Sequence, residues 1–153
     1  FASINYNALL PVFNSNVTPP AYSDLKEKKY TVFVVTGIGN PKPVFDFCRN
    51  TAENVNIISF KDHHGYTEKD IYDICKKFNN SDSENKIIIT TEKDAVKLRA
   101  LNISDKICKD NFFYCPVNIK ILNNEKEELD NLILRFTEKS SSQYRFLTSK
   151  KKY

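Results

Sequence analysis

Three short apolar runs constrain the fold of this chain more than any other feature, because each is followed by a polar motif and then by a helical pattern. The runs cover Thr31–Val35, Val55–Ser59 and Lys86–Thr90. Such runs, rich in Val and Ile, are typical of strands in a buried sheet. Strands that alternate with helices favour a mainly parallel sheet with helices on both faces. The sequence therefore predicts an α/β fold, and its 153 residues are the length of one domain.

The helix after the second run has the clearest signals. Thr67 is predicted to cap it, and Asp70 completes a reciprocal capping box three residues later. Apolar residues then recur at helical spacing. They predict one buried stripe, made of Ile71, Ile74, Cys75 and Phe78.

The helices after the first and third runs are predicted from shorter patterns. Asn40 can cap the first of these helices, with Pro41 at the first helical position, where a missing N–H costs nothing. The residues that it is expected to bury are Val44, Phe45, Phe47 and Cys48. The other helix is expected to begin at about Glu92 and to bury Ala95, Val96 and Leu98.

The segments outside this core are predicted to form smaller elements. Two further strands are expected, at Phe112–Cys115 and Ile119–Leu122. Another is expected over Phe1–Tyr6, followed by a proline-containing connector over Leu9–Ser23. A last helix from about Glu125 would place four apolar residues on one face, namely Leu129, Leu132, Ile133 and Phe136.

The chain ends and the charge distribution predict how the domain is bounded. Because the chain begins with Phe1 rather than Met, we expect a fragment whose α/β domain covers 1–138, with an incoming strand and connector over 1–25. Residues 139–153 hold five basic side chains and no acidic one. We expect this basic tail to be disordered, with contact to anionic lipid headgroups as the alternative. The remainder holds 18 basic and 19 acidic residues, which argues against nucleic-acid binding.

The four cysteines are not arranged as a close metal-binding or redox pair. They are Cys48, Cys75, Cys108 and Cys115. Three of them fall on apolar helix faces or in an apolar strand. We therefore expect small core residues in a reducing compartment, without a disulfide framework or a zinc site.

The only two histidines are adjacent in Asp62-His63-His64, just past the second strand. Histidine is the side chain best suited to transfer protons near neutral pH, and a neighbouring carboxylate raises its basicity or fixes its tautomer. Adjacent side chains of an extended loop point apart, so the two histidines are expected to differ in role. A surface loop without a catalytic role is the alternative. No metal centre built from histidines is expected, because the chain has no third histidine.

The segment Gly37-Ile38-Gly39-Asn40-Pro41 permits a tight turn with close backbone approach. The helix start behind it leaves N–H groups for an anion. The segment lacks the residues that complete a dinucleotide fingerprint or a P-loop. A plain strand-to-helix turn is therefore the alternative to an anion site.

The segment Thr91-Glu92-Lys93-Asp94 is predicted to start a helix. Thr91 can cap it, Asp94 stands at the reciprocal position, and both acids suit the positive end of the helix dipole. Capping does not explain Lys93, which we expect to pair with an acid across the site edge.

Parallel strands point the same way, so the three motifs are expected to gather along one edge of the sheet. In this order and spacing, Thr36–Pro41, Phe60–His64 and Thr90–Leu98 resemble the tetraacyldisaccharide 4′-kinases of lipid A biosynthesis. The similarity covers about Phe1–Phe136. It corresponds to the C-terminal half of that family, a Rossmann-like domain of a two-domain P-loop kinase.

This resemblance implies transfer of the γ-phosphate of ATP to the 4′-hydroxyl of a lipid A disaccharide 1-phosphate, with Mg²⁺. It implies a peripheral protein at the cytoplasmic face of the inner membrane, in contact with the membrane surface. The P-loop and the Mg²⁺ ligands belong to the N-terminal kinase domain of the family, which would be a partner of this domain in the same chain. The fragment alone is therefore expected to be inactive.

The resemblance also implies site residues. His63 is expected to help activate the hydroxyl group, His64 is the second choice, and Asp62 would orient the imidazole. The wall of the substrate or nucleotide cleft would include Gly37, Gly39, Asn40, Thr91, Glu92, Lys93 and Asp94. Two other functions stay open at this point: a non-catalytic module that binds an anion or nucleotide at the glycine turn, and, less favoured, a metal phosphoesterase.

Overall fold

The computed structural model describes residues 2–101, 108–121 and 127–137. It divides into two units, one of Tyr6–Val117 and one that combines Phe1–Asn5 with Asn118–Tyr153. The predicted domain limits at residues 1–138 stay a prediction. The basic tail over 139–153 lies outside the described residues.

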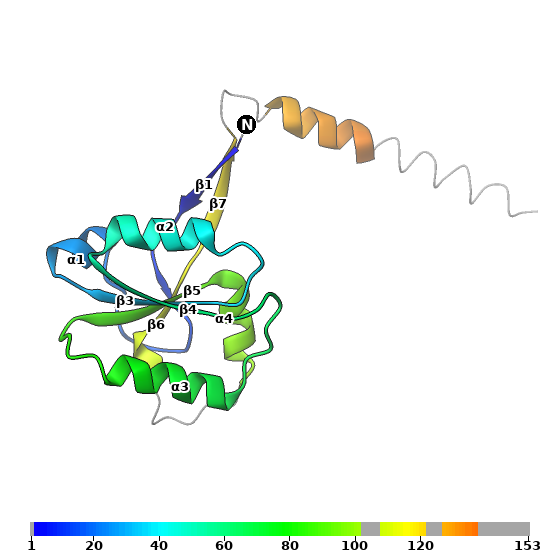
Figure 1. Cartoon of the computed structure of the whole chain (residues 1–153). Helices are drawn as coiled ribbons and strands as arrows, with labels where there is room; N and C mark the ends of the chain where they lie inside the picture. Colours follow the sequence, from blue (N-terminus) through cyan, green and yellow to red (C-terminus); the bar gives the residue numbers. More distant parts are fainter. Residues whose placement is uncertain (1, 102–107, 122–126, 138–153) are drawn as a thin grey trace, which may run out of the picture. The chain divides into compact units, whose positions relative to one another are not determined.

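The larger unit is built on a five-stranded sheet in the order β2-β6-β5-β3-β4. Its central strand β3 is parallel to β4 and β5, and β5 is parallel to β6. Only β2, at one edge, runs antiparallel to its neighbour. The strands are β2 (Leu10–Pro11), β3 (Thr31–Thr36), β4 (Asn54–Ser59), β5 (Lys86–Thr91) and β6 (Phe112–Cys115). This confirms the predicted α/β fold, with all three apolar runs as neighbouring parallel strands (Figure 1).

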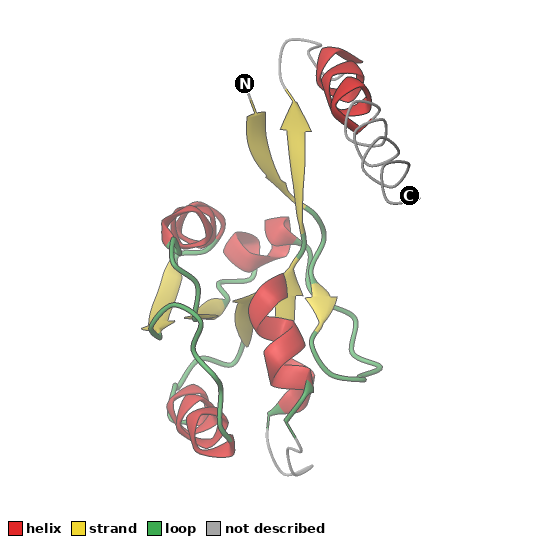
Figure 2. Cartoon of the chain, turned by 90° about the vertical axis from the view of Figure 1, so that its right-hand side faces the viewer, coloured by secondary structure: helices red, strands yellow, loops and turns green. Residues whose placement is uncertain are grey.

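Helices cover both faces of this sheet. Successive side chains of a strand point to opposite faces, so neighbouring residues of β3 pack against different helices. Val32 and Val34 of β3 pack with residues of α1 (Tyr22–Glu27) and α2 (Lys42–Thr51). Phe33 and Val35 pack instead with α3 and α4. These helices are α3 (Glu68–Asn79) and α4 (Glu92–Arg99), and a short 3-10 helix, η1, covers Lys109–Asn111. Figure 2 shows the helices on either side of the strands.

The predicted stripe of α3 is buried as expected, and Thr67 and Asp70 form the predicted capping box. For α2 the structure differs by one or two residues. Its N-cap is Pro41 and its first helical residue is Lys42, so Asn40 is not the cap. Helix ends vary by this much because the first turn has few hydrogen bonds to fix it.

Two predictions of helix burial need correction. In α2 only Val44 and Cys48 are buried, while the two Phe residues of that helix are half-buried. In α4, Val96 is 61% exposed, although Ala95 is fully buried. One residue turns the helix by about 100°, so a neighbour of a buried residue can face water.

The connector predicted over Leu9–Ser23 contains regular structure. It includes the edge strand β2 and the first residues of α1. Pro11 lies in β2, where an edge position leaves its missing N–H without consequence. The short polar segment Tyr22–Glu27 carries only one buried apolar residue, Leu25, which is too little for a periodic pattern.

The prediction that all four cysteines are free was wrong. Cys75 of α3 and Cys108 form a disulfide, with their Cα atoms 6.0 Å apart. Cys48 and Cys115 are free and buried, as predicted. Burial raises the pKa of the Cys48 thiol to about 12 and that of Cys115 to about 11, so both stay protonated at neutral pH. The disulfide joins residues 33 positions apart, which no local pattern could indicate.

A two-stranded sheet pairs β1 (Ala2–Tyr6) with β7 (Val117–Ile121), and all but Tyr6 and Val117 of these strands belong to the smaller unit. This confirms the two predicted strands, although Leu122 and the predicted helix start at Glu125 lie outside the described residues. Residues 127–137 are helical and expose Leu132 and Ile133. None of the helices in the described part of the chain has the length and hydrophobicity that crossing a bilayer requires.

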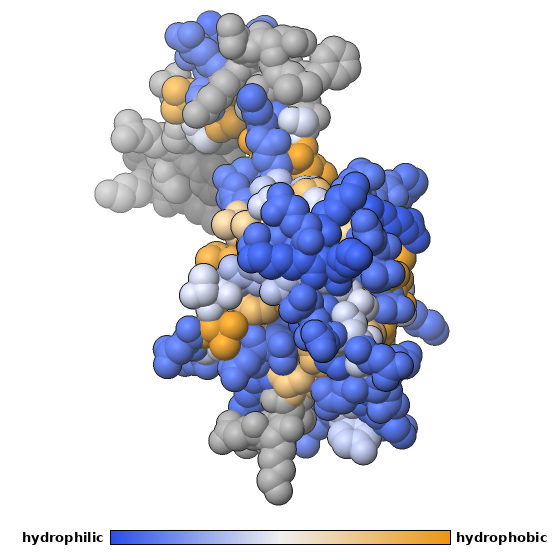
Figure 3. Space-filling model, turned by 90° about the vertical axis from the view of Figure 1, so that its left-hand side faces the viewer, coloured by the Kyte–Doolittle hydropathy of each residue, from blue (hydrophilic) through white to orange (hydrophobic). Residues whose placement is uncertain are grey.

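Figure 3 shows one face of the protein, on which hydrophilic side chains predominate over the larger unit. Hydrophobic side chains appear there as separate spots, which is typical of a solvated surface. The buried apolar residues of the larger unit form the two clusters that lie on either side of the sheet.

Candidate functional site

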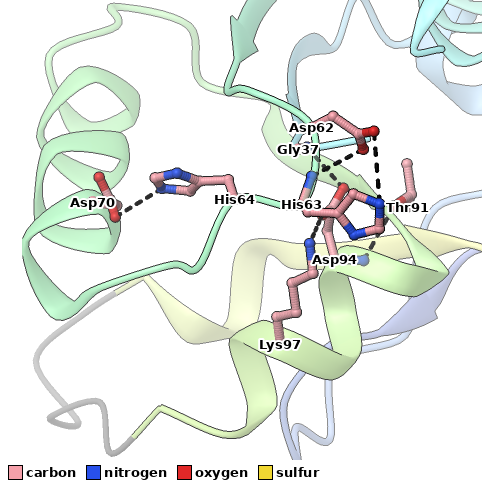
Figure 4. A network of polar contacts seen from close by, with 8 residues as sticks. All are labelled: Gly37, Asp62, His63, His64, Asp70, Thr91, Asp94 and Lys97. Atoms are coloured by element: carbon pink, nitrogen blue, oxygen red, sulfur yellow. Dashed lines mark hydrogen bonds and ion pairs between the residues drawn. The ribbon is translucent and has the colours of Figure 1, made fainter. Parts of the chain in front are cut away.

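The carboxyl ends of β3, β4 and β5 bring the three sequence motifs to one edge of the sheet. Thr36 and Ser59 are paired at the ends of β3 and β4, and Val35 is paired with Thr90 of β5. The loops that leave these strands therefore start side by side, as the parallel arrangement predicts. Figure 4 shows the polar contacts that connect them.

Asp94, in the first turn of α4, links two of these motifs. Its side chain is completely buried. Oδ2 accepts hydrogen bonds from the Gly37 N–H at 3.0 Å and from the Thr91 hydroxyl at 2.8 Å. Oδ1 lies 3.5 Å from Nζ of Lys97. The Gly37 N–H of the glycine turn is thus bonded to a carboxylate of the protein itself (Figure 4).

The same four residues start both α3 and α4, yet their carboxylates are used differently. Thr67-Glu68-Lys69-Asp70 and Thr91-Glu92-Lys93-Asp94 are identical tetrapeptides. Asp70 returns to the backbone N–H of its own cap residue, 2.8 Å away. Asp94 instead reaches the backbone of a residue 57 positions earlier. The repeat can be seen in the sequence. The two helices use it differently, so capping does not account for the hydrogen bond from Gly37 to Asp94.

Asp62 and His63 form an exposed corner beside the glycine turn. Asp62 Oδ1 accepts the backbone N–H of His63 at 2.9 Å, and its Oδ2 is 3.7 Å from His63 Nε2. His63 has φ 57°, a left-handed conformation that costs a non-glycine residue about 1–2 kcal/mol. Its side chain is 91% exposed, so the imidazole is presented to solvent at the sheet edge.

The Asp62 carboxylate lies directly on the glycine turn. A Cβ atom on Gly39 would be 2.9 Å from Asp62 Oδ2, a distance that real Cβ atoms do not show. Any residue other than glycine at position 39 would therefore have to displace the Asp62 carboxylate. Two other motifs therefore meet the glycine turn: the Gly37 N–H is bonded to Asp94, and the Asp62 carboxylate lies next to the exposed Gly39.

His64 points away from His63 and toward α3 (Figure 4). Its Nε2 lies 3.1 Å from Asp70 Oδ2, and its ring stacks on Phe60 with the centroids 4.4 Å apart. Tyr66 packs edge-on against the same ring. The two histidines therefore differ in environment, as predicted: one is in solvent, and the other is packed and hydrogen-bonded.

Asp70 ties this histidine to the start of α3. Burial acts to raise the pKa of the Asp70 carboxyl group, but hydrogen bonds from Thr67 and then His64 outweigh it, so the pKa lies below its usual value. A lowered pKa means that the carboxylate stabilises the fold above its unfolded pKa and loses this effect as the pH falls through the folded pKa.

Sequence reasoning missed Tyr66 and Lys97. Tyr66 is 6% exposed, and its hydroxyl oxygen would be 3.1 Å from a Cβ on Gly37. Burial, and then the charge of Asp94, raise the pKa of Tyr66 above its usual value. Lys97 pairs with Asp94, three residues earlier in the same helix, whereas Lys93 is exposed and the structure shows no ion pair for it across the site edge among the described residues. Residues three apart in a helix lie on one face, which places the Lys97 side chain beside that of Asp94.

The other predicted cleft residues are placed at the same edge. Asn40 and Glu92 are exposed, and Thr91 is half-buried as the cap of α4. Among the described residues, no three His, Cys, Asp or Glu side chains are grouped in a way that could hold a metal ion.

Replacing Gly37 and Gly39 one at a time tests how tightly each side of the glycine turn is packed. Gly37→Ala would place a Cβ 3.1 Å from both His64 Cβ and the Tyr66 hydroxyl oxygen, and overpacking should lower the free energy of unfolding by about 1–3 kcal/mol. Gly39→Ala should cost less than about 0.5 kcal/mol, because the exposed Asp62 carboxylate can turn into solvent.

Urea denaturation of the three variants Gly37→Ala, Gly39→Ala and Gly65→Ala would measure this difference. Gly65 has open space around it and is the matched control. Equal losses of stability at Gly37 and Gly39 would show that the turn is not packed as described.

A family model described as tetraacyldisaccharide-1-P 4′-kinase, LpxK, matches residues 4–138. The chain belongs to this family. The tetraacyldisaccharide 4′-kinase of Bacteroides thetaiotaomicron is 29% identical over 147 residues, which are 92% of this chain and 38% of the relative. That of Shewanella sediminis is 36% identical over 129 residues, or 84% and 31% of the two chains. This LpxK family chain thus spans less than two fifths of these relatives.

One solved structure is also similar, a crystal structure of LpxK from Aquifex aeolicus in complex with ATP. It has a TM-score of 0.49 and 23% sequence identity, and the similarity covers 88% of this chain and 35% of that one.

Proposed function

We propose that this chain is the C-terminal part of a lipid A disaccharide kinase. The full-length protein would transfer the γ-phosphate of ATP to the 4′-hydroxyl of tetraacyldisaccharide 1-phosphate. The observation that carries the proposal is the match of the LpxK family over residues 4–138. The meeting of the three family-like motifs at one edge of the sheet supports it further.

His63 is the residue that we assign to hydroxyl activation. Its imidazole is exposed at the sheet edge, where a substrate can reach it, whereas His64 is occupied by Asp70 and Phe60. An imidazole can accept the proton of an attacking hydroxyl group near neutral pH. Asp62 would hold the His63 backbone through its hydrogen bond, and its Oδ2 lies 3.7 Å from the imidazole Nε2.

The described residues do not fit a Mg²⁺ site. The Asp94 carboxylate is buried and engaged with Gly37, Thr91 and Lys97, and Asp62 is the only other carboxylate shown in contact with the glycine turn. Mg²⁺ usually keeps several waters and binds one or two carboxylates together with phosphate groups of the substrate. We therefore assign Mg²⁺ and most of the ATP contacts to the remainder of the full-length protein.

Phosphoryl transfer depends mainly on positioning and on charge stabilisation. A domain that delivers one imidazole to a nucleotide held by another domain is compatible with this chemistry. The lipid substrate implies work at a membrane surface, and we propose a peripheral location at the cytoplasmic face of the inner membrane.

The chain alone is expected to be inactive, and the full-length protein is expected to be an active kinase. The test incubates each with radiolabelled ATP and tetraacyldisaccharide 1-phosphate and separates the lipids by chromatography. Label should appear in the lipid only with the full-length protein. Turnover by residues 1–153 alone would contradict the proposed division of labour, and hydrolysis of a generic phosphate ester by either would favour a phosphoesterase.

A further inference from the structure

The side chain of Asp94 is the most buried charged group of the candidate site, and its contacts go beyond those of a helix cap. It is 0% exposed, whereas Asp70, at the same position of an identical tetrapeptide, has a side chain that is 22% exposed. Burying a carboxylate is costly unless it is paired and hydrogen-bonded. Gly37 and Thr91 hydrogen-bond to Oδ2 of Asp94, while Oδ1 has the ion pair with Lys97 but no hydrogen-bond partner among the described residues.

The partners of Asp94 come from the ends of two different strands. Thr91 and Lys97 belong to the end of β5 and to α4, while Gly37 directly follows β3. The hydrogen bond to Gly37 joins segments that are 57 residues apart. It therefore fixes the glycine turn against the start of α4.

The other side of the glycine turn carries the loop that contains both histidines. A Cβ on Gly37 would be 3.1 Å from His64 Cβ, and one on Gly39 would be 2.9 Å from the Asp62 carboxylate. The Phe60 N–H also donates to the Thr36 carbonyl at 2.7 Å, just before the turn. Displacing the turn at Gly37 should then displace the loop, because a hydrogen bond joins Phe60 to Thr36 and little free space separates Gly37 from His64.

We infer that Asp94 is a positioning residue: it holds the glycine turn in the place that presents the Asp62–His63 corner to the substrate. This inference rests on the proposed function, since the corner matters for catalysis only if His63 acts on a hydroxyl group. Asp94 itself touches neither the exposed imidazole nor the solvent. It acts through the backbone of Gly37.

The test uses the full-length enzyme and compares Asp94→Ala with the wild type. Hydrogen exchange followed by mass spectrometry should become faster in peptides over residues 36–41 and 60–66, and should be unchanged over 71–79. The kcat per folded enzyme should fall about 10- to 100-fold, since a displacement of about 1 Å can cost this much. The KM for ATP should not change. A purely structural role would lower the melting temperature without this separation of kcat from KM.

Two further variants make the test specific. Asp94→Asn keeps an oxygen that can accept the Gly37 N–H, and it should restore most of the activity. It also supplies the comparison if Asp94→Ala does not fold, because more than a tenfold loss of kcat in the folded Asn variant would overturn the inference. Asp73→Asn makes the same chemical change at an exposed position of α3 and should leave both exchange and kcat unchanged.

The failure of this inference can be distinguished from the failure of the proposed function. Unchanged exchange at 36–41 and 60–66 in Asp94→Ala overturns the inference, whatever reaction the enzyme performs. Faster exchange with an unchanged kcat overturns it as well. A wild-type full-length protein that does not phosphorylate the disaccharide overturns the proposed function, and the exchange comparison then still decides whether Asp94 holds the turn and loop.

Discussion

Replacing His63 with alanine is expected to lower the kcat of the full-length enzyme about 10²–10⁴-fold, the usual contribution of a general acid or base. The imidazole is 91% exposed and makes no packing contact that the fold needs, so the loss should appear in the chemical step and not in stability. Steady-state phosphorylation of tetraacyldisaccharide 1-phosphate by the wild type and by His63→Ala would measure it.

His64→Ala is the matched control for this prediction. His64 stacks on Phe60 and contacts Asp70, so its removal should lower the melting temperature and reduce kcat much less than His63→Ala. The reverse result, with a large loss of kcat only in His64→Ala, would transfer the proton-transfer role to His64. An unchanged kcat in both variants would remove histidine from the mechanism.

The second large effect concerns the sheet that supports the site. Phe112→Ala should lower the free energy of unfolding of the domain by about 3–5 kcal/mol, the cost of a large cavity in a packed core. Phe112 is fully buried on the face covered by α3 and α4. Its ring packs edge-on against Phe13, with the centroids 5.6 Å apart. Urea denaturation followed by circular dichroism would measure the loss.

Tyr72→Ala provides the comparison for Phe112→Ala. Tyr72 is 60% exposed on α3, so its removal should change the free energy of unfolding by less than about 0.5 kcal/mol. A loss below about 1 kcal/mol in Phe112→Ala would mean that β6 does not form part of a continuous core with β5.

The parallel sheet and its edge could be predicted because their signals are local. The apolar runs that became β3, β4 and β5 are bounded by polar residues, and the capping box of Thr67 with Asp70 lies within four positions. Such patterns are fixed by side-chain alternation and by backbone hydrogen bonds between near neighbours. The elements missed in the sequence, β2 and α1, are too short to show a period.

The disulfide and the role of Asp94 depend on residues that are far apart in the chain. Cys75 meets Cys108 only because the fold brings α3 next to the residue that precedes η1. Asp94 and Asp70 follow identical residues, but one carboxylate is buried against Gly37 and the other stays at the surface. Nothing within the tetrapeptide distinguishes them.

The sequence by itself determined the alternation of strands and helices from β3 to α4, the parallel sheet and the end of the strands at which the three motifs lie. Only the tertiary structure decided which histidine faces solvent, which lysine pairs with Asp94 and which glycine amide is already occupied. The physical reason is that strand and helix formation depend on local periodicity, whereas burial and pairing depend on which surfaces meet once the sheet has formed.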